Sequence, residues 1–233
     1  MSDLLHRHEK HIFDQRYDWQ SIDVKAAHAT PEILELLREA CLVESVLPAY
    51  IAKMMDLFWD DLDASTIFVV EGFEAYTHYY TLRRYLDTVG YRPITDEEVI
   101  ELRRKERDSA YDNPVRELVN FMATEHYAAA FFRDIKEYIK EPVLKAMMPR
   151  FVDEEERHSQ FAADLISSVI ERDPSKRSEV IEAVKNAQHI GSYFLPKIHP
   201  VTSNNLATLI AFNRRIEDLL GESLSDVLVK GDL

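Results

Sequence analysis

The chain has 233 residues, 46% of them hydrophobic, and its 42 acidic and 28 basic residues give a net charge of −14. This length is enough for one large core, and the negative charge disfavours binding to nucleic acid phosphates. Cys41 is the single cysteine, so an internal disulfide is excluded. No apolar run resembles a signal peptide or reaches the roughly 20 residues of a membrane-spanning helix. We therefore expect a cytoplasmic protein that neither spans a membrane nor binds nucleic acid.

Periodicity and composition predict an all-α fold. Only five glycines are present, and no stretch alternates apolar and polar residues for long. We expect residues 1–30 to form an N-terminal arm and residues 31–233 a single helical domain. Apolar spacing predicts long core helices at about 31–60, 65–89, 114–139 and 142–172, with further helices near 95–109, 175–195 and 203–220. Four long helices in two hairpins indicate a four-helix bundle with additional flanking helices.

Local signals mark where several of these helices begin and end. Pro31 and Pro114 are suited to first helical positions, and Gly90 to a helix end. Thr95 and Glu98 have the spacing of a capping box. Pro48 and Pro149 lie within predicted helices, where each removes one backbone hydrogen bond, so we expect a kink at each.

Acidic side chains and histidines lie on the faces of the core helices that should be apolar. They are Glu44 on the first helix, Glu71, Glu74 and His78 on the second, Glu125 on the third, and Glu155 and His158 on the fourth. Unpaired carboxylates in a bundle core cost several kcal/mol or take up protons, so inward carboxylates require positive charge among them. Two metal ions supply that charge in bundles that carry one Glu on each of two helices and a Glu-x-x-His pair on each of the others.

The spacing of these residues matches such a dinuclear site. Glu155 precedes His158 by three residues, and the separations Glu44 to Glu74 and Glu125 to Glu155 are both 30 residues. Glu74 precedes His78 by four residues instead of three, so Glu71, about two turns from His78, is kept as the alternative. The predicted metal ligands are Glu44, Glu74, His78, Glu125, Glu155 and His158.

Other polar residues have simpler interpretations. Glu154 and Glu156 are expected to face solvent as neighbours of an inward Glu155. A metal role is not expected for the terminal histidines His6, His8 and His11, and Cys41 is expected to be a small core residue. The alternative for the whole cluster is a structural bundle in which the acids pair with arginines.

The segments "VESVLPAY", "THYYTLRRYLDTVGYR", "DEEERHSQF" and "IERDPSKRSEV" occur in this order along the chain. Together they resemble the soluble acyl-acyl carrier protein desaturases, which are ferritin-like di-iron enzymes. "VESVLPAY" resembles the first ligand helix of that family, and "THYYTLRRYLDTVGYR" resembles the segment after its first Glu-x-x-His motif. "DEEERHSQF" is similar to its second motif and "IERDPSKRSEV" to the helix end that follows. The resemblance extends weakly from "DWQS" at 18–21 to about residue 200.

The resemblance implies a function. It implies two iron ions, with manganese possible in place of one, and dioxygen as a co-substrate in the desaturation of an acyl chain. Acyl carrier protein and a ferredoxin-like electron donor are the implied partners, and a homodimer is the expected assembly. Trp19, Glu154 and His78 resemble positions on the family's electron path. The basic segment "ELRRKER" at 101–107, with Arg83 and Arg84, is either a carrier-protein contact or an ordinary charged helix.

Three departures keep other functions open. Ala75 stands where the family has its ligand Glu, Ala128 stands where it has a Thr near the oxygen site, and the chain is shorter than the plant desaturases. A di-iron oxygenase of a small metabolite, such as an N-oxygenase or a hydroxylase, is therefore the first alternative. A ferroxidase or iron-storage protein is the second.

Overall fold

The computed structural model describes residues 17–108, 112–187 and 206–224. Over these ranges the chain forms helices and no strand, which confirms the all-α prediction. The elements are the 3₁₀ helix η1 (Trp19–Ser21) and the α-helices α2 (Val24–Ala27), α3 (Pro31–Glu44), α4 (Leu47–Leu57), α5 (Leu62–Thr88), α6 (Asp96–Asp108), α7 (Pro114–Lys136), α8 (Pro142–Arg172), α9 (Lys176–Lys185) and α12 (Leu206–Leu220). None of the described helices is long and apolar enough to cross a membrane.

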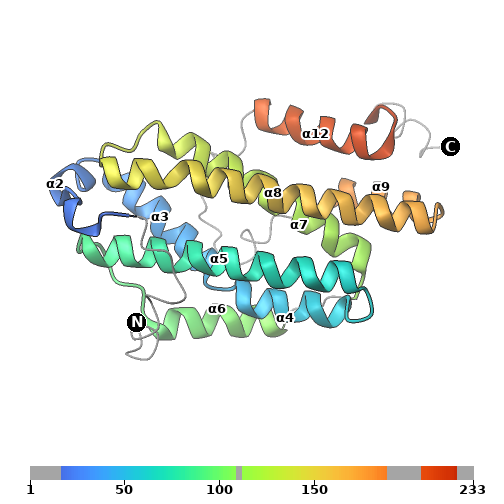
Figure 1. The fold of residues 1–233 in the computed structure, drawn as a ribbon, viewed down its shortest axis with the longest axis horizontal. Coiled ribbons are helices and arrows are strands. Elements are labelled where there is room, and N and C mark those ends of the chain that lie inside the picture. The colour runs from blue at the N-terminus through green and yellow to red at the C-terminus, as the bar shows by residue number, and fades with distance from the viewer. Residues whose placement is uncertain (1–16, 109–111, 188–205, 225–233) are drawn as a thin grey trace.

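The long helices pack into a bundle. Helices α3 and α4 follow one another along α5, α5 also contacts α8, and α8 packs along α7. Inside the bundle, Tyr50 of α4 packs against Phe121 of α7, with ring centroids 6.0 Å apart. Helix α6 lies outside α4, and α12 lies on the opposite side against α7 and α8 (Figure 1). The predicted helical bundle with flanking helices is thus confirmed.

Most of the predicted helix boundaries have a visible cause. Thr95 and Glu98 form the reciprocal capping pair, with N···O distances of 2.9 and 3.2 Å. The side chain of Asn113 accepts a hydrogen bond from the amide of Arg116 at the start of α7. Gly90 has a φ of 66° directly after α5, a conformation that favours glycine.

The expected helix at 31–60 is two helices. Helix α3 ends at Glu44 and α4 begins at Leu47, because Pro48 has no amide hydrogen to bond the carbonyl of Glu44. Ser45 lies in the break, and its hydroxyl bonds the carbonyl of Leu42. Pro149, by contrast, lies inside α8, which is assigned as one helix across it. The first core helix therefore ends at a predicted metal ligand.

The N-terminal region has helical segments of its own. η1 and α2 lie within the expected arm, and Ala27 of α2 is buried in the main core. Residues 1–16, which include His6, His8 and His11, are outside the described ranges, as is most of the segment between α9 and α12. The proposed boundary at residue 30 stays a prediction.

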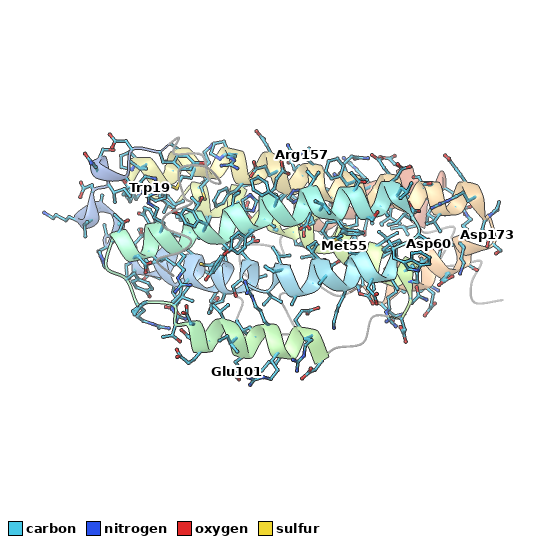
Figure 2. The ribbon with its side chains drawn as sticks, turned by 60° about the horizontal axis from the view of Figure 1, so that its bottom comes forward. Trp19, Met55, Asp60, Glu101, Arg157 and Asp173 are labelled. Carbon is cyan, nitrogen blue, oxygen red and sulfur yellow. The ribbon has the colours of Figure 1, made fainter. Side chains whose placement is uncertain are left out.

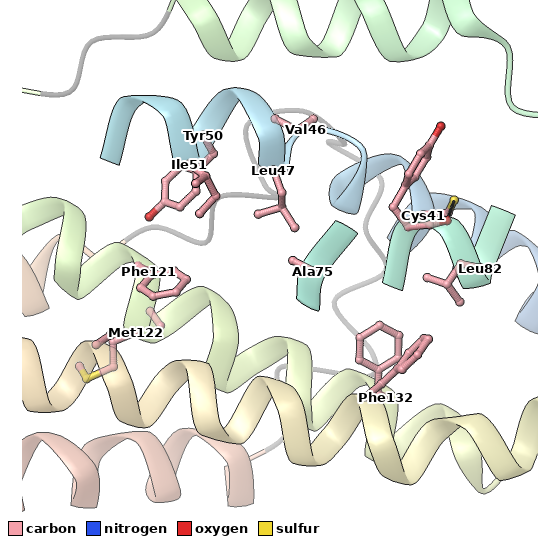
Figure 3. Packing of buried hydrophobic residues seen from close by; sticks show 14 of the residues in the cluster. Cys41, Val46, Leu47, Tyr50, Ile51, Ala75, Leu82, Phe121, Met122 and Phe132 are labelled. Atoms are coloured by element: carbon pink, nitrogen blue, oxygen red, sulfur yellow. Dashed lines mark hydrogen bonds between the residues drawn. The ribbon is translucent and has the colours of Figure 1, made fainter. Parts of the chain in front are cut away.

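Helix α4 lies close to α5 at Gly72. A Cβ atom added at Gly72 would lie 3.0 Å from Cγ1 and 3.1 Å from Cγ2 of Ile51. Ile51 is buried in the core shown in Figure 3, near Tyr50 and Phe121. Gly72 is the residue after Glu71, so this contact lies one residue from the buried polar group of α5.

We predict that Gly72→Ala destabilises the protein, although alanine is the better helix former. The overpacking cost of about 1–3 kcal/mol exceeds the gain of about 1 kcal/mol in helix propensity. In an Ile51→Ala background the clash is absent, so the same change should raise the free energy of unfolding. Urea unfolding of the four proteins of this cycle measures both effects, and stabilisation by Gly72→Ala in the parent would contradict the expected close contact.

Candidate metal centre

Two groups of buried acids and histidines lie at the centre of the bundle. The first consists of Glu44 from the end of α3, His78 from α5 and Glu155 from α8, and its potential ligand atoms lie within 4.8 Å of one another. Nδ1 of His78 lies 2.9 Å from Oε1 of Glu155 and 3.9 Å from Oε1 of Glu44. All three residues are buried.

The second group contains Glu71 of α5, Glu125 of α7 and His158 of α8, with its ligand atoms also within 4.8 Å of one another. Nδ1 of His158 lies 3.4 Å from Oε2 of Glu125. The three side chains are buried. The two groups together draw on α3, α5, α7 and α8.

Glu155 connects the two groups. Its Oε1 faces Nδ1 of His78 at 2.9 Å, and its Oε2 faces Nδ1 of His158 at 3.1 Å. The two imidazole rings have centroids 6.4 Å apart. One carboxylate thus offers an oxygen to each group, as a ligand shared by two ions would.

Several polar atoms of these groups lack a hydrogen-bond partner and are positioned as metal ligands would be. Both carboxylate oxygens of Glu71 and Nδ1 of His78 are buried without a hydrogen bond of acceptable geometry. Such atoms are rare in folded proteins unless an ion or water binds them. Spacings near 3 Å are also those of neighbouring ligands that lie about 2.0–2.2 Å from one ion.

Within the described ranges, arginines do not neutralise the inner carboxylates. No arginine there forms an ion pair with Glu44, Glu71, Glu125 or Glu155; the arginines pair instead with carboxylates further out, such as Glu74 and Glu154. The structural alternative, in which arginines clasp the inner acids, is therefore not what the described part of the chain shows. The donor set of carboxylates and imidazoles suits first-row transition metals such as iron and manganese.

Comparison with protein-family models, curated proteins and solved structures finds no match for this chain. The structure itself shows a helical bundle with two buried groups, each of two glutamates and one histidine, that could hold two metal ions. It does not show which enzyme family the chain belongs to.

Each histidine has an outer carboxylate partner. Nε2 of His78 lies 2.7 Å from Oε2 of Glu154, and the other oxygen of Glu154 accepts a 2.7 Å hydrogen bond from Nε of Arg150. Nε2 of His158 lies 2.9 Å from Oε2 of Glu74. A carboxylate that accepts from Nε2–H leaves the lone pair of the ring on Nδ1, which is the atom that faces the centre.

Glu74 belongs to this outer layer. An NH2 group of Arg157 donates to both oxygens of Glu74 at 2.8 Å, and 21% of the Glu74 side chain is exposed whereas Glu71 is fully buried. The structure thus places the alternative Glu71, and not Glu74, in the buried group with Glu125 and His158. With Glu71 in place of Glu74, the two glutamate separations are no longer equal: Glu44 and Glu71 are 27 residues apart, whereas Glu125 and Glu155 are 30 residues apart.

Two further expectations can be compared with the site. Glu154 does not face solvent, and that expectation is wrong, because α8 turns Glu154 toward His78. Glu156 does face solvent, where it pairs with Arg133. Arg150, four residues before Glu154, could have been found from the spacing of an i,i+4 pair. Arg157 could not, because its partner lies 83 residues away on another helix.

Aromatic rings cover the histidines on the apolar side. The ring of Phe151 lies 4.4 Å from that of His78, and Phe132 packs on both. Phe161 lies beside His158 with centroids 6.4 Å apart. These contacts exclude water and hold both imidazoles in place. Trp19, by contrast, stacks under Arg84 at 4.3 Å, and its role on an electron path stays a prediction.

In the absence of metal ions, burial and neighbouring charges shift the pKa values of the inner glutamates and of His78. Burial raises the pKa of Glu44 and of Glu125, and the charge of Glu155 raises both further. Burial raises the pKa of Glu71 to about 8, even though His158 opposes the shift. Burial alone would lower the pKa of His78, but Glu155 and Glu154 raise it to about 10. Burial thus favours the protonated form of Glu44, Glu71 and Glu125 in the metal-free centre, and the neighbouring carboxylates favour the protonated form of His78.

We predict that Glu71→Ala and Glu74→Ala have different effects on metal binding. Loss of Glu71 would remove one of the three potential ligands of its group, so the bound metal should fall from two ions per chain to one. Loss of Glu74 removes a hydrogen bond to a ligand, so both ions should still bind, about 10–100-fold more weakly at one position. Titration with Mn²⁺ or Co²⁺ followed by elemental analysis separates the two, and loss of an ion only with Glu74→Ala would reverse the assignment.

We also predict a specific pH dependence for the metal-free protein. The pKa of Glu71 is about 8 in the folded chain against 4.5 as its ordinary value. Between these values the folded state holds a proton that the unfolded state lacks, so this group lowers stability as pH rises. Glu71→Gln stays neutral, and its stability relative to the parent should increase from pH 5 to pH 8 and then level off. Urea unfolding with a chelator measures this, with Glu156→Gln as control; a flat difference would contradict it.

Proposed function

We propose that the protein is a dinuclear metal enzyme that uses dioxygen to oxidise an organic substrate. The observation that carries the proposal is the position of Glu155, with one oxygen toward each imidazole Nδ1. One ion would be held by Glu44, His78 and Glu155, and the other by Glu71, Glu125, His158 and the second oxygen of Glu155. Four inner carboxylates match the charge of two divalent cations.

The ions, when bound, would supply the redox chemistry for reaction with dioxygen. The protein supplies a dry and rigid setting for them. Phe132 and Phe151 exclude water from the His78 side. The outer carboxylates Glu74 and Glu154 orient the two rings and hold the proton on each Nε2.

An acyl chain is the proposed substrate, with iron as the proposed metal and manganese possible at one position. Support comes from the resemblance to acyl-acyl carrier protein desaturases together with the inner positions of Glu44, Glu125, Glu155 and both histidines. An acyl carrier protein, a ferredoxin-like electron donor and a homodimeric assembly belong to the same proposal.

One observation favours a second candidate, a di-metal oxygenase of a small metabolite. Glu71 is the inner carboxylate on α5 and lies seven residues before His78, whereas the desaturase motif has three. A ligand two helical turns before the histidine, instead of one, would leave a different side of the ions free for substrate. Turnover with acyl-carrier substrates and with small amines, each with reductant and dioxygen, distinguishes the two candidates.

We predict that Glu155→Ala removes both ions, because each of its oxygens would serve a different ion. The parent should carry about two metal equivalents per chain and consume dioxygen when reduced, and the variant should do neither. Elemental analysis and an oxygen electrode measure the two effects.

The matched control is Glu156→Ala, the next residue on α8, which pairs with Arg133 at the surface. It should keep both ions and the oxygen consumption. A parent that binds no metal would leave a structural bundle, and metal uptake with oxygen consumption but no organic product would indicate a ferroxidase.

A further inference from the structure

A groove of about 710 Å³ lies between α4 and α6, on the outer side of the bundle. Each helix lines it with residues at positions i, i+3, i+4 and i+7, so one continuous face of each helix is turned to the groove. The lining residues are Ala49, Ala52, Lys53 and Asp56 of α4 and Ile100, Arg103, Arg104 and Arg107 of α6. The volume lies within the range of about 300–1,000 Å³ typical of small-molecule sites.

The charge of the groove is opposite to that of the protein. Four of its five charged side chains are basic and Asp56 is the one acid, in a chain with a net charge of −14. Arg107 also pairs with Asp108, the next residue, at 3.0 Å. Glu101, which Figure 2 shows on the outer side of α6, pairs with Lys105 away from the groove. Arg83 and Arg84 do not line it; Arg83 bonds the carbonyl of Ile94.

Two of the basic side chains are held by backbone carbonyls. Nε of Arg103 donates to the carbonyl of Ser45 at 2.7 Å, and Nζ of Lys53 donates to the carbonyl of Glu106. A carbonyl orients a cation without cancelling its charge. Lys53 is also 3.9 Å from the carboxylate of Glu106, a long ion pair. A guanidinium held in this way is arranged in advance for an anion with several oxygens.

The groove also has an apolar floor. Ala49 and Ala52 leave space along α4, and Ile100 is 55% exposed beside them. We propose that the groove binds a phosphorylated small molecule, with its phosphate among Arg103, Arg104 and Arg107 and its apolar part on Ala49, Ala52 and Ile100. The inference does not depend on the metal centre.

Isothermal titration of the metal-free protein with butyl phosphate and with inorganic phosphate tests the proposal. Both should bind at one saturable site, and butyl phosphate more tightly, because its alkyl group covers the apolar floor. Arg104→Gln should weaken both by about tenfold, the effect of one charge-assisted hydrogen bond. Ala52→Glu, which adds a carboxylate at an exposed position of the groove, should abolish binding.

The matched control is Lys105→Gln. It removes the same charge from the neighbouring residue, which does not line the groove, so binding should stay within about twofold of the parent. Equal losses in Arg104→Gln and Lys105→Gln would show unspecific attraction and overturn the proposal. Absence of saturable binding, or equal affinity for the two probes, would overturn it as well.

Discussion

The site depends on the burial of carboxylates that have no arginine partner in the part of the chain that the structure describes. Glu44, Glu71, Glu125 and Glu155 lie inside a core of aromatic and aliphatic side chains. In such surroundings a carboxylate must be protonated or lie beside a cation. The helices are long and the core is well packed, so this arrangement persists only if protons or metal ions supply the compensating charge.

Much of the fold follows from local signals that act within a few residues. Some residues determine the backbone conformation where they occur, so the helix boundaries near them could be predicted. They are the prolines at the first positions of helices, the Thr95–Glu98 capping pair and Gly90. Pro48 correctly predicted where the helix is interrupted, but the predicted kink is a complete break between α3 and α4. A lost hydrogen bond can bend a helix or end it, and packing of both parts against α5 decides between the two.

The site could be predicted only in part, for a geometric reason. Residues three, four and seven apart on α5 all lie near one face, so helical periodicity cannot rank Glu71 against Glu74. The difference between them comes from Arg157 of α8, which donates hydrogen bonds to both oxygens of Glu74 and holds it in the outer layer. Glu71 then lies in the inner group. That contact joins two helices far apart in the chain and leaves no local pattern in the sequence.

The outer layer also decides from which atoms protons would leave when ions bind. Hydrogen bonds from His158 and Arg157 lower the pKa of Glu74 to about 2, so Glu74 stays ionised and holds the proton on Nε2 of His158. Glu154 acts on His78 in the same way, with Arg150 behind it. The protons that remain exchangeable are those on the inner carboxyls and on each Nδ1. Metal binding at this centre would thus exchange inner protons for ions, and its affinity would rise with pH.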